Sequence, residues 1–367
     1  MARLRSIPPI ATAFAVCLLA SLSARAQQEA PGTGSTFAPL FAGHTPLEVT
    51  IEAPLKTLME ERPDDEYLEG RFSYTGDDGT EHSFDLKLRT RGNFRRKPEI
   101  CRFAPIRLNF QRKQVKDTLF DGQDKLKLVT HCQQSDPTYE QYTLREYLAY
   151  RILQLMTDKS FAARLLHINY VDTEGRYSRE KYGFVLEDDD DVARRNGMKL
   201  VETGNVRHAD LDPVPENLVN VFMYMIGNTD YSLIQGPPDD GCCHNSLLLS
   251  ANDGPPYTPL PYDFDFSGLV KAEYAAPNPR FRLRNVRSRL YRGQCSNNEL
   301  LPATVQRFID RKDAVYALVD ELHMFSSNSR RLTIRYLDSF YYAISNPDTI
   351  SLEFLHQCLG AGQEATG

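Results

Sequence analysis

The sequence lacks tryptophan, has no excess of positive charge, and has no apolar run of membrane-spanning length after residue 26. Its 43 lysines and arginines against 49 aspartates and glutamates give a formal net charge of −6. Binding to nucleic acid by counterion release needs a clustered basic excess, so this composition does not favour a nucleic-acid partner. With 41% hydrophobic and 25% charged residues, the chain is typical of a globular protein.

The first 26 residues are typical of a secretory signal peptide. Arg3 and Arg5 form a charged start, residues 10–22 are almost entirely apolar or small, and residues 24–26 (Ala-Arg-Ala) fit a cleavage site. We therefore expect export to the periplasm or the extracellular space, with no transmembrane span after cleavage. An uncleaved N-terminal anchor is the alternative.

Six cysteines follow the predicted signal peptide, and an even number in an exported chain predicts disulfides. Fifteen pairings are possible, and the sequence does not choose among them. We expect the adjacent Cys242 and Cys243 to bond to different partners. A zinc site is the alternative, but no C-x-x-C pair or histidine cluster supports it. The other four are Cys101, Cys132, Cys295 and Cys358.

Periodicity predicts an α+β chain with two lobes. Residues 27–45 are rich in Gly, Pro, Ser and Thr and predict a linker. Apolar residues then alternate at strand spacing over much of residues 46–190, with one amphipathic helix between Glu140 and Met156. Residues 191–360 are mainly helical in pattern. We therefore expect an N-terminal lobe (46–190) built on an antiparallel sheet and a helical C-terminal lobe (191–360), with a cleft between them.

Acidic and amide side chains in the second half form the densest group of candidate site residues. Asp230 follows a predicted helix, Asn245 precedes a short strand, and Asp263 and Asp265 follow the next strand. In phosphoryl transfer, one carboxylate orients the acceptor hydroxyl, while amide and carboxylate oxygens hold Mg²⁺ against the nucleotide phosphates. The alternative for each residue is ordinary turn and capping chemistry, which Asn and Asp favour.

Basic side chains form a second candidate site in the predicted sheet. A glycine turn in Arg91-Gly92-Asn93 lets backbone amides approach a phosphate, and arginine can bind it bidentately. Arg107 and Lys127 are the strand cations best placed to reach a nucleotide. An exposed basic loop and edge-strand charges are the alternatives. Glu146 is a possible ion-pair partner for one of these cations.

Six motifs in order along residues 85–270 resemble the CotH family of spore-coat atypical protein kinases. They are Arg91-Gly92-Asn93, residues 144–150 (LREYLAY), residues 182–187 (YGFVLE), Asn228-Thr229-Asp230, His244-Asn245 and residues 261–265 (PYDFD). The resemblance implies a bilobal protein-kinase-like fold that binds ATP with Mg²⁺ or Mn²⁺.

The same resemblance implies a role for each candidate residue. Asp230 would be catalytic, and Asn245, Asp263 and Asp265 would hold the metal. Glu187 would lie beside the adenine, and Arg91 and Gly92 over the phosphates. The predicted function is an exported atypical kinase that transfers the ATP γ-phosphate to a protein hydroxyl. The alternatives are transfer of an adenylyl or glutamyl group by the same fold, and a catalytically inactive binding or structural protein of the cell envelope.

Overall fold

Alternating burial along the first strands creates an enclosed apolar interior. The computed structural model describes residues 37–76, 78–175, 178–238 and 240–360. In β4 (Ile106–Phe110), Ile106, Leu108 and Phe110 are buried, whereas the residues between them are only half-buried. Successive side chains of a strand point to opposite faces, so one face of this sheet is apolar and the other is polar.

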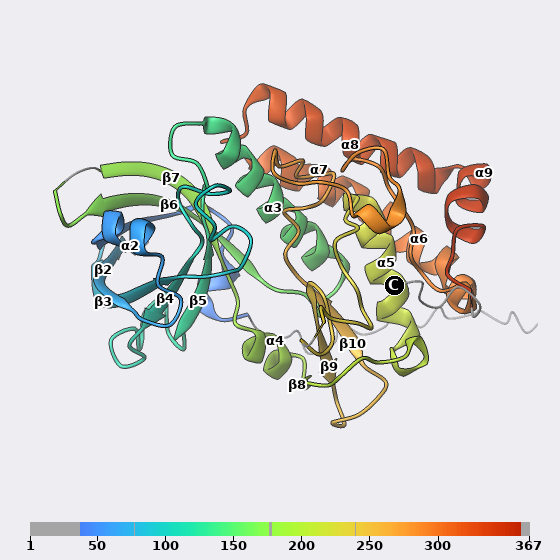
Figure 1. The fold of residues 1–367 in the computed structure, drawn as a ribbon, viewed down its shortest axis with the longest axis horizontal. Coiled ribbons are helices and arrows are strands. Elements are labelled where there is room, and N and C mark those ends of the chain that lie inside the picture. Colours follow the sequence, from blue (N-terminus) through green and yellow to red (C-terminus); the bar gives the residue numbers. More distant parts are fainter. Residues whose placement is uncertain (1–36, 77, 176–177, 239, 361–367) are drawn as a thin grey trace, which may run out of the picture. The chain divides into compact units, whose positions relative to one another are not determined.

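Seven strands of the described residues close into a barrel in the order β1-β2-β3-β4-β5-β7-β6 (Figure 1). Most neighbouring pairs are antiparallel, but β1 and β6 pair in parallel, with Leu47 opposite Leu166. Besides β4, the barrel strands are β1 (Leu47–Ala53), β2 (Leu68–Thr75), β3 (Glu81–Thr90), β5 (Lys125–Val129), β6 (Ala163–Asp172) and β7 (Ser178–Leu186).

The expected bilobal protein-kinase-like fold with an antiparallel-sheet N-lobe is therefore wrong. The predicted strands form, but the parallel pairing of β1 with β6 joins the two ends of the sheet and leaves it without edges. An alternating pattern identifies a strand and its buried face, but it does not identify the partner of each strand. The edge-strand alternative for Arg107 and Lys127 is wrong for the same reason, because β4 and β5 each pair with neighbours on both sides.

Helix α3 (Pro137–Met156) connects the barrel to the rest of the chain. Its N-cap Asp136 accepts a hydrogen bond from the Thr138 backbone N–H, and Pro137 occupies the first helical position, as is common at helix starts. The helix packs against β6 and β7 on the barrel side and against α5 and α7 on the other. It is therefore almost entirely buried from residue 143 to residue 153.

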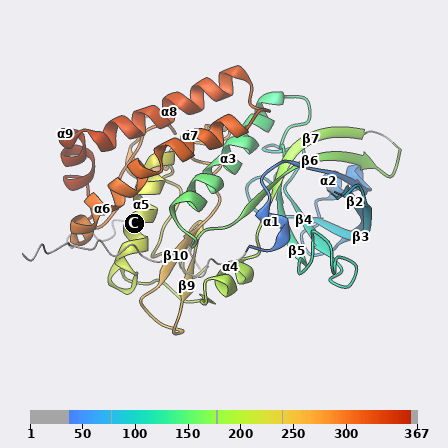
Figure 2. The same ribbon diagram turned by 180° about the vertical axis from the view of Figure 1, so that it is seen from behind.

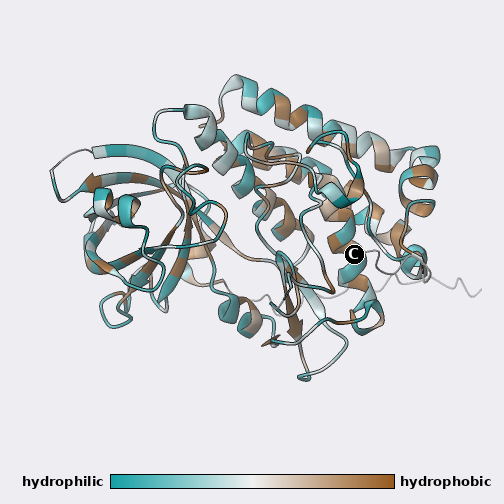
Figure 3. Cartoon of the chain, viewed as in Figure 1, coloured by the Kyte–Doolittle hydropathy of each residue, from teal (hydrophilic) through white to brown (hydrophobic). Residues whose placement is uncertain are grey.

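The remaining described chain combines a small sheet with helices (Figure 1), and Figure 3 shows hydrophobic and hydrophilic residues interspersed along the helices. Its core surrounds α5 and is distinct from the apolar cluster inside the barrel. The sheet has the order β10-β9-β8, with β8 (Lys199–Val201), β9 (Ser246–Ser250) and β10 (Thr258–Pro261). The helices are α4 (Asp189–Arg195), α5 (Pro213–Ile226), α6 (Leu301–Asp310), α7 (Lys312–Glu321), α8 (Ser327–Ser345) and α9 (Pro347–Ile350), the last continued by one π-helical turn (Ser351–Leu355).

Two short helices lie in the N-terminal part of the described chain. Helix α1 (Pro39–Ala42) falls within residues 37–45 and buries Leu40 and Phe41; Figure 2 shows it beside the barrel, where it contacts β6. Helix α2 is Leu55–Glu61. The predicted signal peptide and residues 27–36 lie outside the described residues. Within the described part of the chain, no helix is both long and apolar enough to cross a membrane.

Three disulfides join the six cysteines after residue 26. Cys101 bonds to Cys132, Cys295 to Cys358, and Cys242 to Cys243. The expectation that Cys242 and Cys243 have different partners is wrong, because the two neighbouring sulfurs bond to each other. The first bond joins the loop that follows β3 to the chain just after β5, and the last joins the segment before α6 to the chain end described after α9.

We expect Ile51→Ala to lower the free energy of unfolding by about 2–5 kcal/mol, as measured by chemical denaturation. Ile51 is fully buried in β1, opposite Phe72 of β2 and Tyr170 of β6, so truncation leaves a cavity where the barrel closes. Thr50→Ala is the control, because Thr50 is only half-buried and points away from the interior. Equal effects of the two substitutions would contradict the closed barrel.

Candidate functional site

A buried arginine joins three parts of the chain at the predicted site. Arg95, in the loop after β3, contacts Glu146 of α3 at 3.1 Å, Asp263 at 3.2 Å and Asp265 at 3.3 Å. Glu146 and Asp265 are almost inaccessible, whereas the Asp263 side chain is 42% exposed. Glu146 thus has a cationic partner, as expected, but the partner is Arg95 rather than Arg107 or Lys127.

The charges around Arg95 do not balance. Three carboxylates share one guanidinium, which leaves a formal charge of −2 when all are ionised. Burial lowers the pKa of Arg95, but the charges of Asp265 and Glu146 outweigh this effect and raise it well above its ordinary value. Burial raises the pKa of Asp265 well above its ordinary value, and that of Glu146 as well. The guanidinium therefore stays charged, and burial favours the protonated forms of both Asp265 and Glu146.

Asp230, His244 and Asn245 form a second, more accessible cluster. His244 Nε2 lies 3.0 Å from Asp230 Oδ1, and Asn245 Nδ2 donates to Asp230 Oδ2 at 3.1 Å and to the Asp230 carbonyl at 2.7 Å. The Asp230 and His244 side chains are 32% and 38% exposed. The amide nitrogen of Asn245 is used in its hydrogen bonds to Asp230. The amide oxygen of Asn245 is therefore the atom that can bind a further ligand.

Local sequence positions this cluster. Helix α5 ends at Ile226 and is capped by Gly227, whose φ of +64° favours glycine. The Asn228 side chain then accepts a hydrogen bond from the Asp230 backbone N–H at 2.8 Å. Asn245 and Asp263 have φ values of +50° and +61°, a left-handed conformation that Asn and Asp tolerate better than most residues. The turn chemistry considered as the alternative is therefore present, and the same turns bring Asp230 and Asn245 into contact.

The acidic cluster around Arg95 is electrostatically linked to His244. The hydrogen bond that His244 donates to Asp230 raises the pKa of His244 above 6.5 against the opposing effect of burial, and the charges of Asp230 and Asp263 raise it further. The Tyr262 backbone N–H donates to the Asn245 carbonyl at 3.0 Å, which places Asp263 next to the His244-Asn245 pair. The structure thus brings Asp230 and Asn245 into contact and places Asp263 nearby, whereas Asp265 points to buried Arg95.

Three basic residues form a ladder on the outer face of the barrel. Arg89, Arg107 and Lys127 lie directly opposite one another on β3, β4 and β5. Like charges in opposite cross-strand positions are destabilising. The Nε atoms of Arg89 and Arg107 are buried and have no hydrogen-bond partner among the described residues. Such a basic ladder (Arg89, Arg107 and Lys127) would be stabilised by a bound anion.

The basic ladder lies beside the acidic residues. Lys127 Nζ contacts Asp189 at 2.9 Å and lies 5.9 Å from the ring centre of Tyr262, the residue before Asp263. Burial lowers the pKa of Lys127, and Arg91 and Arg107 add to the effect, whereas Asp189 opposes it. The partner of Lys127 thus lies in the first turn of α4, which Asp188 caps.

The Arg91-Gly92-Asn93 loop borders both groups. The Arg91 backbone N–H donates to the carbonyl of Pro105, directly before β4, at 2.9 Å. Burial lowers the pKa of Arg91, the charge of Asp263 opposes this effect, and the charges of Arg95 and Arg107 reinforce it. Gly92 has a φ of +79°, and an added Cβ would meet no atom within 4 Å. Asn93 is exposed. Open space therefore adjoins the glycine turn, as a ligand approaching the backbone would require.

Glu187 has a separate role in the described structure. Its carboxylate accepts hydrogen bonds from Arg195 at 2.8 Å and from the Ala162 backbone N–H at 3.0 Å, and it is buried. Burial raises its pKa, and Arg195 opposes that shift. Both carboxylate oxygens are thus occupied within the protein, so the side chain fixes the end of β7 against α4.

No three or more His, Cys, Asp or Glu side chains converge on a possible metal position in the described ranges. The donors near Asp263 have the chemistry of a Mg²⁺ or Mn²⁺ site, since carboxylate and amide oxygens are the preferred ligands of hard cations. The guanidinium of Arg95, however, occupies Oδ1 of Asp263 and contacts Asp265. A metal ion would therefore depend on the exposed part of Asp263, with Asn245 as the amide ligand predicted from the sequence.

Two residues of this site were not predicted from the sequence. Arg95 is one of several arginines and a lysine between Arg89 and Lys97, and spacing alone does not show which one turns inward. His244 belongs to the His244-Asn245 motif but was given no role. A histidine directly before the candidate metal ligand was the available signal.

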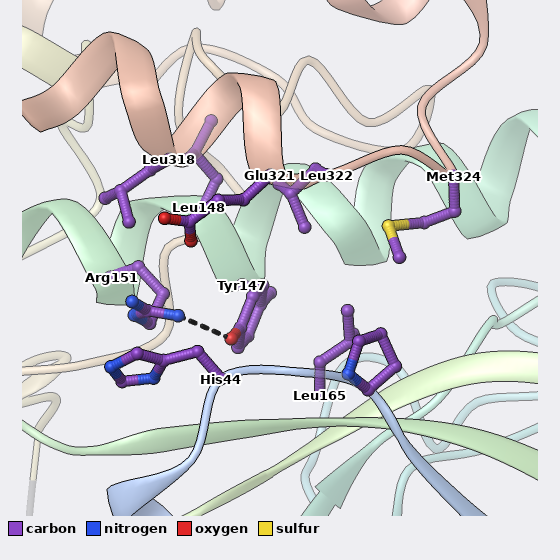
Figure 4. A pocket seen from close by; sticks show the side chains of 10 residues that line it. His44, Tyr147, Leu148, Arg151, Leu165, Leu318, Glu321, Leu322 and Met324 are labelled. Carbon is purple, nitrogen blue, oxygen red and sulfur yellow. Dashed lines mark hydrogen bonds between the residues drawn. The ribbon is translucent and has the colours of Figure 1, made fainter.

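A separate small hollow lies between α3 and α7 and contains none of the predicted site residues. Its volume is about 20 Å³, enough for about one water molecule. Figure 4 shows His44 beside Arg151, which donates a 2.9 Å hydrogen bond to the Tyr147 hydroxyl. Burial and the charge of Arg151 lower the pKa of His44. A nucleotide is far too large for this space.

No family model matches the chain, and no curated protein is significantly similar to it.

We expect Arg95→Gln to destabilise the protein by about 3–5 kcal/mol at neutral pH, because it leaves buried carboxylates without a cation. The loss should shrink at acidic pH, where Asp265 and Glu146 protonate. Arg96→Gln is the matched control, because its partly exposed side chain pairs with exposed Asp64 and should contribute about 0–1 kcal/mol. Chemical denaturation across the pH range measures both effects. A pH-independent loss in Arg95→Gln would contradict the shared guanidinium.

We expect His244 to titrate above 6.5 in NMR experiments, and its pKa to fall in Asp230→Asn. A histidine with a raised folded-state pKa adds stability that is fully present below the unfolded value near 6.5 and is lost as pH rises through the folded value. His244→Gln should therefore be most destabilising, relative to the wild type, below about pH 6.5. An unchanged pKa of His244 in Asp230→Asn would show that the contact with Asp230 does not stabilise the protonated form of His244.

Proposed function

We propose that the protein is a metal-dependent phosphotransferase that moves the γ-phosphate of ATP to a protein hydroxyl. The observation that carries the proposal is the position of the basic ladder beside Asp263, with Lys127 over the ring of Tyr262, the residue before Asp263. A polyphosphate needs cations along its length, and phosphoryl transfer needs carboxylate and amide oxygens at the reacting end. The ordered motifs that resemble the CotH family support the same proposal.

In the proposed reaction, the basic ladder binds and orients the phosphates. Asp230 accepts the proton of the acceptor hydroxyl while the oxygen attacks the γ-phosphorus and the bond to the β-phosphate oxygen breaks, so that ADP leaves. The His244 and Asn245 contacts hold the Asp230 carboxylate in place. Asp263 and Asn245 would hold Mg²⁺ or Mn²⁺, which neutralises phosphate charge when bound. The sequence also predicts that the protein is exported. ATP would therefore have to be supplied outside the cytoplasm.

One observation favours a second function, that of an inactive binding protein. Arg95 neutralises part of the charge of Asp263 and Asp265, which a catalytic metal would otherwise do. If Arg95 takes the place of the metal ion, the basic ladder could bind an anion, but no phosphoryl group would be transferred. Binding and transfer must therefore be measured separately.

We expect the full-length chain with γ-labelled ATP and Mn²⁺ to transfer label to itself or to an added protein. Asp230→Asn and Asp263→Asn should lower the rate at least 100-fold, in the range expected for loss of a general base or a phosphate-side ligand. Asp253→Asn is a matched control, because Asp253 is an exposed aspartate with a φ of +59°, close to the +61° of Asp263. Its rate should be unchanged.

Further measurements separate the remaining alternatives. Label from the α-phosphate of ATP, or from glutamate, would identify adenylyl or glutamyl transfer instead. A thermal shift with ATP and Mn²⁺ but no transfer would identify the inactive binding protein. Equal transfer by wild type and both aspartate variants would overturn the proposed residue roles.

A further inference from the structure

An arginine-rich segment follows the acidic cluster in the sequence. The arginine segment (residues 278–292) begins with a one-turn 3₁₀ helix, Pro279–Phe281, capped by Asn278. It contrasts with the net negative charge of the whole chain. Its arginines are Arg280, Arg282, Arg284, Arg287, Arg289 and Arg292.

The arginine segment is anchored on both sides of Asp230. Asn278 Nδ2 donates to the carbonyl of Thr229 at 3.4 Å, and Arg292 Nη1 donates to the carbonyl of Tyr231 at 2.5 Å. The Arg292 guanidinium also lies over the Tyr231 and Phe281 rings, at 4.5 and 4.7 Å from their centres. The residues before and after Asp230 are therefore each tied to this segment.

Some of the arginines have internal partners, and others do not. Arg289 donates to the carbonyls of Met225 and Tyr336, and Arg287 lies over the Tyr336 ring. Arg280, Arg282 and Arg284 are exposed, and within the described ranges no carboxylate lies at ion-pair distance from them. Arg282 has a φ of +48°, which turns the chain directly after the 3₁₀ helix. Three unpaired cations thus lie on the short segment that adjoins the Asp230 loop.

We propose that Arg280, Arg282 and Arg284 bind an acidic polypeptide segment and present its hydroxyl group to Asp230. This inference rests on the proposed phosphotransferase function and names its acceptor: a serine- or threonine-containing segment with several aspartates or glutamates near the hydroxyl. The guanidinium groups would pair with those carboxylates, which suits arginine because its planar donor fork matches a carboxylate. The donor phosphates would occupy the basic ladder, so the two anionic substrates would have separate cationic surfaces.

A nucleic acid is the less favoured ligand for the arginine segment. The affinity of a protein for nucleic acid depends on many phosphate contacts along an extended basic surface. The three exposed arginines are confined to residues 280–284, on a segment that is tied to the residues on either side of acidic Asp230. A short acidic polypeptide needs only a few ion pairs beside the attacking hydroxyl.

Binding can be tested without any transfer. We would measure fluorescence anisotropy of a labelled nine-residue peptide with one serine and flanking glutamates, against the same peptide with glutamines, using the full-length chain. We expect the glutamate peptide to bind at least tenfold more tightly at low salt and to lose this advantage at high salt. In the triple variant Arg280→Gln/Arg282→Gln/Arg284→Gln, its affinity should fall about tenfold.

The matched control is Arg112→Gln/Arg331→Gln/Arg335→Gln, which removes the same charge from three exposed arginines on other parts of the surface. Its affinity should fall less than twofold, and circular dichroism checks that both variants fold. Equal affinity for the two peptides, or equal losses in both triple variants, would overturn the inference. Tighter binding of a single-stranded oligonucleotide than of the glutamate peptide would also overturn it.

Transfer measurements separate this inference from the proposed function. Selective binding of the glutamate peptide with no transfer to it would retain the docking surface and contradict the phosphotransferase. Transfer to both peptides at the same rate would retain the phosphotransferase and contradict the docking surface. We expect the triple variant to raise KM for the glutamate peptide about tenfold with little change in kcat, because these arginines bind the acceptor away from the reacting atoms.

Discussion

The shared contact of Arg95 with Glu146, Asp263 and Asp265 is the interaction on which the site depends. It connects the loop after β3, the central helix α3 and the chain after β10. A buried charge without a partner costs several kcal/mol, so each of the three segments is constrained by the other two. The barrel and the acidic residues are therefore held together by electrostatics as well as by apolar packing, and the position of Asp263 depends on a residue of the barrel loop.

Sequence patterns were most informative where a local rule decides the outcome. Alternation in residues 106–110 and helical spacing in residues 140–156 predicted β4 and α3, and both elements form. The same patterns did not reveal the parallel pairing of β1 with β6, because a strand's period gives its buried face but not its neighbour. The expected antiparallel sheet was wrong for that reason, although strands do form in residues 46–190.

The site shows the same division between local and long-range information. The preference of Asn and Asp for tight turns predicted that Asp230 and Asn245 lie in loops. The hydrogen bond between them joins residues 15 positions apart in the sequence, and this local preference does not predict it. Which arginine reaches Glu146 is decided by the direction in which the loop after β3 turns, and charge spacing carries no information on that direction. The disulfide between Cys242 and Cys243 is a similar case. The sequence is compatible with fifteen pairings of the six cysteines, and it does not show which of them forms.

The distribution of charge gives the proposed reaction a physical logic. An acidic protein carries two compact basic surfaces. In the basic ladder, Lys127 lies over the ring of Tyr262, the residue before Asp263, and Arg280–Arg284 lie on the segment that is tied to the residues on either side of Asp230. Two polyanionic substrates held on these surfaces would repel each other and the carboxylates between them. Arg95 offsets only one of the three negative charges that contact it. A divalent cation at Asp263 would remove most of the remaining imbalance at the point where the substrates meet, which is why an acidic cluster between two cationic surfaces suits phosphoryl transfer better than either surface alone.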